Sequence, residues 1–182
     1  MERQRKSSIG SMLITAVVIL ASIVYLIISL NTRDFLWFVS TYRAQASAII
    51  IHCYGTDVIV DPADQAFSAI NTAVNQAISQ KKRWDSLSLS DETYADYLEN
   101  PKMAVLEVHY EKPETIHSTY MFFKKFNQLL IPLDGRHADY NTVFGRLGEH
   151  PEAGSFHLTD KTPLIRVLEE HNKCKIQNSQ GG

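Results

Sequence analysis

The sequence predicts an α+β protein in which a single transmembrane helix precedes one domain with a mainly antiparallel sheet packed by two or three helices. Three observations predict this fold. An uncharged, strongly apolar run occupies residues 7–32 of the 182-residue chain. β-Branched runs are grouped in the middle of the remaining sequence. Helical spacing of apolar residues occurs after the first of these runs and again near the C-terminus, without the strict alternation of a βαβ fold.

The apolar run from Ile9 to Leu30 is long enough to cross a membrane as a helix. Its 22 residues match the roughly 20 that a helix rising about 1.5 Å per residue needs to cross a hydrocarbon core about 30 Å thick. A helix also pairs every backbone group within one segment, which the bilayer core requires. The aromatic cluster at residues 35–38 is typical of the far interface, and we expect the helix to continue through it toward Tyr42.

The charges beside this run predict its orientation. Three basic residues and one acidic residue precede it, and one of each follows it: Arg3, Arg5, Lys6 and Glu2, then Arg33 and Asp34. By the positive-inside rule, residues 1–8 stay in the cytoplasm and the domain from residue 43 is extracytoplasmic. The alternative is a cleaved signal peptide, for which Ala44-Gln45-Ala46 offers a site. The apolar run is, however, longer than the typical signal-peptide core of about 7 to 15 residues.

The remaining chain has the length and charge of one acidic domain. Residues 43–172 form this domain and residues 173–182 a disordered tail. Residues 1–8 hold three of the 18 Lys and Arg residues and one of the 20 Asp and Glu residues, so the rest of the chain has a net charge of −4. This balance argues against a nucleic-acid partner. The basic cluster Lys81-Lys82-Arg83 is predicted to end a helix, where cations suit the macrodipole; the alternative is an anion or phospholipid patch.

The two cysteines, Cys53 and Cys174, lie far apart in the sequence, and Cys174 belongs to a polar segment. An oxidising exterior would allow a disulfide between them. The spacing and the polar surroundings of Cys174 nevertheless favour a buried free thiol at Cys53.

The first half of the domain predicts a hairpin and two helices. The hairpin joins residues 46–54 to residues 58–60 across Gly55. A helix starts at Asp61-Pro62 and buries one apolar face, made of Phe67, Ile70, Val74 and Ile78. Ser90 caps a shorter helix that ends at Asn100-Pro101.

The second half predicts strands followed by a helix. Residues 103–111 and 115–123 form a hairpin, and residues 127–133 add another strand. A polar loop follows from Asp134 to Arg146, then a short strand at residues 154–158. Thr162-Pro163 begins the last helix.

Two groups of residues are candidates for chemistry. His109 and His117 would lie on paired strands, where a surface metal site can form, although solvated strand faces explain the same pattern. The polar loop offers a ligand-binding set: Arg136 to clamp an anion, His137 positioned by Asp139, and Asn141. The alternative is that Asp139 and Asn141 only hold turns. No cofactor is predicted, and a hydrolase using Ser118 or Ser155 has no motif behind it.

Three functions remain open. The first is a single-pass membrane-anchored protein, held in the bilayer by residues 9–30, whose exported domain is an accessory or interaction module for a protein partner in the cell envelope. The second is an exported ligand-binding or sensing domain that uses the 134–146 loop. The third is a tethered hydrolase or metalloenzyme. The absence of a catalytic motif favours the first.

Overall fold

The computed structural model describes residues 9–120, 123, 125–148 and 150–177, and it has the predicted α+β fold. The chain divides into two units. The first holds residues 9–39 with residues 117–120, and the second holds the other described residues. One helix belongs to the first unit, while three helices and a seven-stranded antiparallel sheet form the second.

Helix α1, Ile9–Thr32, is apolar, and most of its side chains are exposed, whereas Ser29 is buried and Tyr25 and Ile28 are half-buried. Hydroxyl side chains within it bond to the preceding turn, as Thr15 does to the Ser11 carbonyl at 2.9 Å. The predicted continuation toward Tyr42 is wrong, because the helix ends at Thr32. Arg33 takes the left-handed conformation with φ 55°, and the Asp34 carboxylate then accepts the N–H of Leu36 at 2.8 Å, which turns the chain.

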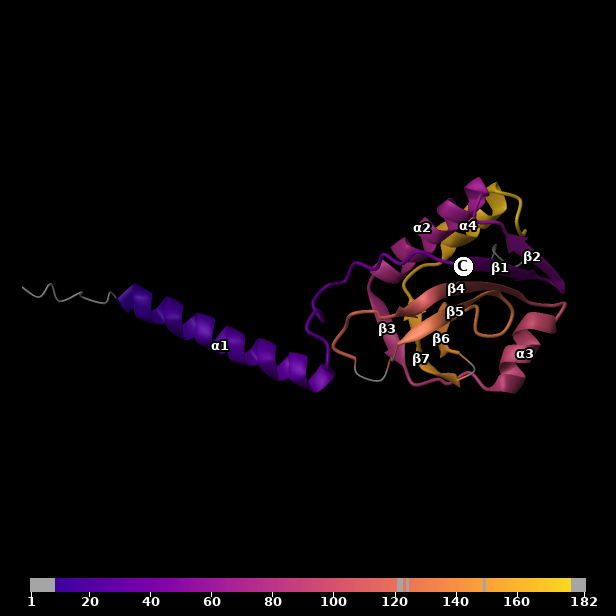
Figure 1. Cartoon of the computed structure of the whole chain (residues 1–182). Coiled ribbons are helices and arrows are strands. Elements are labelled where there is room, and N and C mark those ends of the chain that lie inside the picture. The colour runs from indigo at the N-terminus through magenta and orange to yellow at the C-terminus, as the bar shows by residue number, and fades with distance from the viewer. Residues whose placement is uncertain (1–8, 121–122, 124, 149, 178–182) are drawn as a thin grey trace, which may run out of the picture. The chain divides into compact units, whose positions relative to one another are not determined.

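The sheet of the second unit has the strand order β2-β1-β4-β5-β6-β7-β3, so β2 and β3 are its edge strands (Figure 1). The strands are β1 Ala48–Cys53, β2 Thr56–Val60, β3 Lys82–Asp85, β4 Ala104–Glu114, β5 Phe126–Asp134, β6 Thr142–Leu147 and β7 His150–Leu158. The β1–β2 hairpin confirms the first predicted one. Tyr54 and Gly55 form its turn with φ of 50° and 83°, the positive values that a tight two-residue turn requires.

Helix α2, Gln65–Ser79, buries the four apolar residues predicted to face the sheet. It begins later than the predicted start at Asp61-Pro62. The N-cap is Asp64, whose carboxylate accepts the N–H of Ala66 at 2.9 Å.

The chain before β1 is bonded to α2. The N–H groups of Tyr42, Ala44 and Ala46 donate to side-chain oxygens of Ser79, Asn75 and Asn71 at 2.8, 3.2 and 3.1 Å. These three acceptors are spaced four residues apart, so they lie along one face of α2. Residues 42–46 are therefore built into the domain.

The basic cluster Lys81-Lys82-Arg83 does not end a helix, and that prediction is wrong. Gln80 has an extended backbone that stops α2. Residues 82–85 instead form β3, in which Arg83 lies opposite His157 of β7.

Helix α3, Asp91–Glu99, lies on the opposite face of the sheet from α2 and α4 (Figure 1). Ser90 caps it as predicted, accepting the N–H of Thr93 at 3.2 Å. Tyr97 is fully buried against this face of the sheet. It packs in one apolar cluster with Leu89, Val105, Leu130 and Phe144.

The central strands pair differently from the prediction. The partner of β4 is β5, with Leu106 opposite Ile131 and Val108 opposite Leu129. Residues 115–120 form no strand, so the hairpin predicted between residues 103–111 and 115–123 is wrong. The long loop predicted from Asp134 to Arg146 is also shorter, because Thr142–Leu147 form β6.

Helix α4, Thr162–Glu170, begins at the predicted residues and packs beside α2. The chain after it is held by a disulfide, with the sulfurs of Cys53 and Cys174 2.04 Å apart. The predicted free thiol at Cys53 is therefore wrong. The tail predicted to be disordered from residue 173 is wrong for residues 173–177, because Cys174 and Ile176 are buried. Its residues 178–182 lie outside the described part of the chain.

Candidate functional site

The predicted ligand-binding residues lie in the turn between β5 and β6, but they do not converge. Arg136 and Asp139 are exposed. His137 is half-buried and its Nδ1 is hydrogen-bonded to the hydroxyl of Tyr97 on α3. Within the described residues no bond joins His137 to Asp139, and the positioning of His137 by Asp139 stays a prediction.

The same turn has a structural role. His137 and Asn141 take left-handed conformations with φ of 63° and 52°. The Lys161 amine donates to the Ala138 carbonyl at 2.6 Å, which holds the turn from outside. Burial, followed by the nearby Arg136 guanidinium, lowers the pKa of His137.

The two metal candidates have separate partners. His109 lies opposite Gln128 in the β4–β5 pair rather than opposite His117. The Nδ1 of His117 is 2.9 Å from a carboxylate oxygen of Asp34, which belongs to the same unit. In the part of the chain that the structure describes, no group of three or more His, Cys, Asp and Glu residues is arranged to hold a metal ion.

The two serines considered for a hydrolase, Ser118 and Ser155, belong to different units of the chain. Ser118 donates its hydroxyl to the Tyr120 carbonyl at 3.4 Å in the first unit. Ser155 is fully buried in the sheet of the second unit.

A buried polar network crosses the sheet face beneath α3, and the sequence did not predict it. Glu107 on β4 is its centre and is only 3 % exposed. One carboxylate oxygen is 2.8 Å from His52 Nε2, and His52 Nδ1 is 2.7 Å from an Asp57 oxygen. The other accepts hydrogen bonds from the hydroxyl of Tyr94, at 3.0 Å, and from the amide of Gln128. The network therefore ties α3 to four neighbouring strands.

The network keeps opposite charges in its two central groups. Burial would raise the pKa of Glu107. His109, whose Nε2 lies 3.0 Å from a carboxylate oxygen, outweighs burial together with hydrogen bonds from His52 and Tyr94, and they hold that pKa far below its ordinary value. Burial would lower the pKa of His52, but its bonds to Glu107 and Asp57 raise it. A carboxylate with so low a pKa is a weak general base, so this arrangement suits a structural ion pair better than proton transfer.

Arg146 on β6 extends the network and is 6 % exposed. Its guanidinium lies 3.7 Å from the centroid of the Tyr94 ring, and Nη2 is 3.7 Å from an oxygen of Asp91. Its Nε and Nη1 have no hydrogen-bond partner among the described residues. The aromatic ring is therefore the main neighbour of this buried cation.

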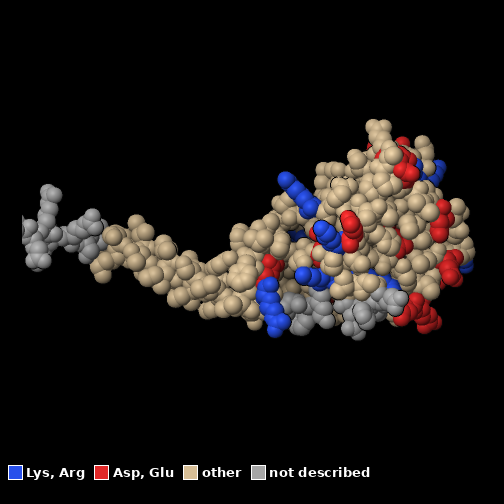
Figure 2. Space-filling view, viewed as in Figure 1, with Lys and Arg blue, Asp and Glu red and all other residues tan. Residues whose placement is uncertain are grey.

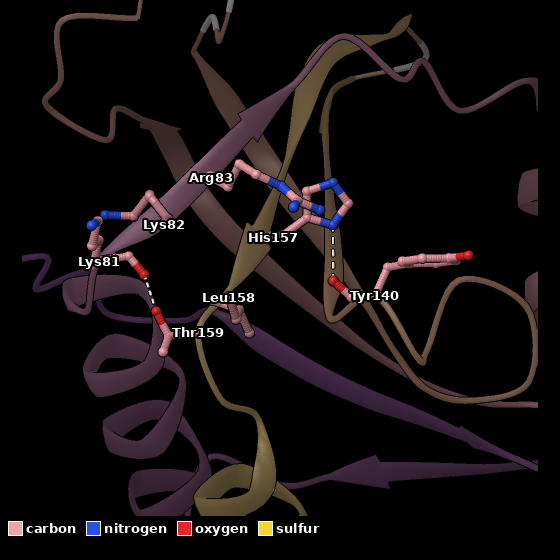
Figure 3. A pocket seen from close by; sticks show the side chains of 7 residues that line it. All are labelled: Lys81, Lys82, Arg83, Tyr140, His157, Leu158 and Thr159. Carbon is pink, nitrogen blue, oxygen red and sulfur yellow. Dashed lines mark hydrogen bonds between the residues drawn. The ribbon is translucent and has the colours of Figure 1, made fainter. Parts of the chain in front are cut away.

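A basic pocket lies where β3 meets the end of β7 (Figure 3). We use this name for a cavity of about 270 Å³ lined by Lys81, Lys82, Arg83, Tyr140, His157, Leu158 and Thr159. Arg83 lies alongside the imidazole of His157, whose Nδ1 is 2.8 Å from the Tyr140 carbonyl. The Thr159 hydroxyl donates to the Lys81 carbonyl, and burial lowers the pKa of Lys82.

Sequence reasoning identified the three basic residues of this pocket as a cluster, but assigned them to a helix end. A strand would have been the better prediction. In a strand, successive side chains point to opposite faces, so Lys82 and Trp84 lie on one face of β3 and Arg83 and Asp85 on the other. No local pattern predicts the place of His157, because its neighbours come from distant segments.

Comparisons of the chain with protein-family models, with curated proteins and with solved structures find no match. Neither a family nor a relative therefore assigns an activity to these residues.

Proposed function

We propose that this chain is a single-pass membrane protein in which α1 crosses the bilayer, residues 1–8 face the cytoplasm and the domain from residue 43 is extracytoplasmic. The 24 residues of α1 extend about 36 Å, and a hydrocarbon core is about 30 Å thick. Its exposed apolar side chains suit contact with lipid, and the basic N-terminal flank supports the orientation.

Two features of the domain support this location. Disulfides persist in oxidising compartments and are rare in the cytosol, so the Cys53–Cys174 bond supports an extracytoplasmic domain. The second feature supports an uncleaved anchor. Cleavage after Ala46 would remove Tyr42 and Ala44, which are each 6 % exposed and bonded to α2.

In the cell envelope the domain acts as an accessory module that binds a protein partner. The observation that carries this function is the edge strand β2. Its Ile59 is 75 % exposed and lies beside Ile50, its cross-strand neighbour. An apolar strand at a sheet edge is a surface to which a partner can add a strand. The other edge, β3, is four residues long and carries Lys82 and Arg83, features that oppose such pairing.

Topology is tested with reporters fused to the C-terminus in bacterial cells. Alkaline phosphatase, which needs an oxidising exterior, should be active, and a reporter that works only in the cytosol should be silent. The chain should also remain in membranes after a carbonate wash. A mature chain that begins after Ala46, or an active cytosolic reporter, would contradict the proposal.

The partner surface is tested by replacing Ile59 with a photo-crosslinking amino acid. The matched control is the same replacement at Arg166, an exposed residue of α4. We expect a crosslinked product of discrete mass from position 59 and none from position 166. Ile59→Lys should abolish copurification of that partner without changing membrane insertion or disulfide formation. No product at position 59, or equal products at both positions, would overturn this function.

A further inference from the structure

The basic pocket is lined by three cationic side chains, and the Lys81 and Lys82 amines lie apart from the Arg83 guanidinium, which is beside His157 (Figure 3). Within the described residues, the side chains of Lys81, Lys82 and Arg83 form no ion pair or hydrogen bond. The acidic residue beside them, Asp85, has its carboxylate 2.8 Å from His157 Nε2 and accepts the N–H of Ser86 at 2.7 Å. No acidic side chain of the described residues therefore pairs with these cations.

This concentration of positive charge is unusual in an acidic chain. In Figure 2, Lys and Arg side chains lie on the visible face of the domain with an Asp or Glu side chain among them, and further Asp and Glu side chains lie on the side of α3. Lys82 is also half-buried, with its amine 6.0 Å from the centroid of the Trp84 ring. A half-buried amine without a counter-ion loses hydration, and an incoming anion would offset that loss.

We propose that the basic pocket binds a phosphate group, either as the free ion or as the headgroup of a lipid. A phosphate monoester carries about −1.5 to −2 charges at pH 7, which suits a pocket with three cations. Lysine contacts phosphate as a point charge, and arginine contacts it through two parallel hydrogen bonds. The volume of about 270 Å³ lies just below the range of about 300 to 1,000 Å³ typical of ligand sites, so it suits a small anion better than a large cofactor.

The test uses the full chain, purified in a neutral detergent and titrated by calorimetry at constant ionic strength. One arm uses inorganic phosphate, and the other uses a short-chain phosphatidic acid that dissolves in the same detergent. We expect saturable binding in at least one arm. Lys82→Gln/Arg83→Gln should weaken it by about tenfold, because two of the three cations that line the pocket are removed. Similar affinities in both arms would identify phosphate itself as the ligand, and tighter binding of the lipid would identify a headgroup.

The matched control is Lys112→Gln/Arg166→Gln, which removes the same two charges from exposed positions outside the pocket. Its affinity should stay within about twofold of the natural chain. Lys81→Glu is a second variant, since this exposed residue can change without disturbing Trp84. Disulfide formation and far-ultraviolet circular dichroism report whether each variant folds. The proposal is overturned if the natural chain shows no saturable binding, or if folded pocket variants bind as the control does. Neither result depends on the partner surface at β2.

Discussion

His52 Nε2 lies 2.8 Å from a carboxylate oxygen of Glu107, so two residues 55 positions apart in the chain form a buried ion pair between neighbouring strands. Asp57 binds the other side of the imidazole, and Tyr94 binds the carboxylate from α3. Removing one partner of such a pair leaves the other charge buried without compensation. Because Tyr94 of α3 bonds to this pair, and because the charge of each partner depends on pH, the stability of α3 packing should also depend on pH.

The pair makes stability depend on pH in both directions. The pKa of Glu107 is lowered by folding, so its contribution is present above its unfolded value of about 4.3 and is lost as pH falls through the folded value. The pKa of His52 is raised, so its contribution is complete below about 6.5 and is lost as pH rises through the folded value. We expect the pair to stabilise the domain most between about pH 4.5 and 6.5.

Urea unfolding in mild detergent at pH 5.5 and 8.5 measures this dependence. Glu107→Gln should lower the free energy of unfolding by about 3 kcal/mol at pH 5.5 and by less at pH 8.5. The control is Glu111→Gln, an exposed position on the same strand. An equal loss for Glu107→Gln at both pH values would show that the ion pair does not set the dependence.

Tyr94 contacts the network through both its hydroxyl and its ring, and two substitutions measure the contribution of each to stability. Tyr94→Phe removes the hydroxyl that bonds Glu107 and Gln128 but keeps the ring beneath Arg146. We expect it to cost about 1 kcal/mol. Tyr94→Leu also removes the cation–π contact and should cost about 1 kcal/mol more. Chemical denaturation measures both, and equal costs would show that the ring contact adds nothing.

The disulfide closes a sequence separation of 121 residues and should stabilise the domain substantially. Cys53→Ser/Cys174→Ser should lower the free energy of unfolding by roughly 2 to 5 kcal/mol. Dithiothreitol should destabilise the natural chain by a similar amount and leave the double variant unchanged. A chain from cells that moves identically on reducing and non-reducing gels, with both thiols reactive, would show that the bond does not form.

Alanine substitutions at two glycines with positive φ distinguish the cost of backbone strain from the cost of a steric clash. Gly135 has φ 86°, and an added Cβ would lie 2.7 Å from Met103 Cγ. Gly148 has φ 59°, and a Cβ there would meet no atom of the described residues within 4 Å. Both alanine substitutions strain the backbone by about 1 kcal/mol, and Gly135→Ala should cost a further 1 kcal/mol or more because Met103 must move. Thermal unfolding of both variants measures the difference, and equal melting temperatures would contradict it.

The predicted elements that were confirmed depend on local chemistry. The face of α2 follows from four apolar residues at helical spacing, and the start of α3 follows from a serine cap. The wrong predictions concern which segments meet. Residues 115–123 look like a partner for β4, but the more apolar β5 takes that place in the buried sheet.

The candidate site was predicted less well, because it too depends on contacts between segments that are distant in the sequence. The turn residues Arg136, His137 and Asp139 are close in sequence, yet their side chains have different surroundings. Glu107 was not singled out from the sequence. Its burial follows from α3 packing over it, which alternation along β4 does not reveal.

The sequence by itself determined the long apolar helix, the α+β class and most helix starts, because periodicity and capping act within about ten residues of chain. Only the tertiary structure decided that Cys53 meets Cys174, that Lys81, Lys82 and Arg83 border a pocket, and that Glu107 is buried beside His52. Each of these depends on contacts between distant segments. The burial and charge of a polar side chain are set by those contacts.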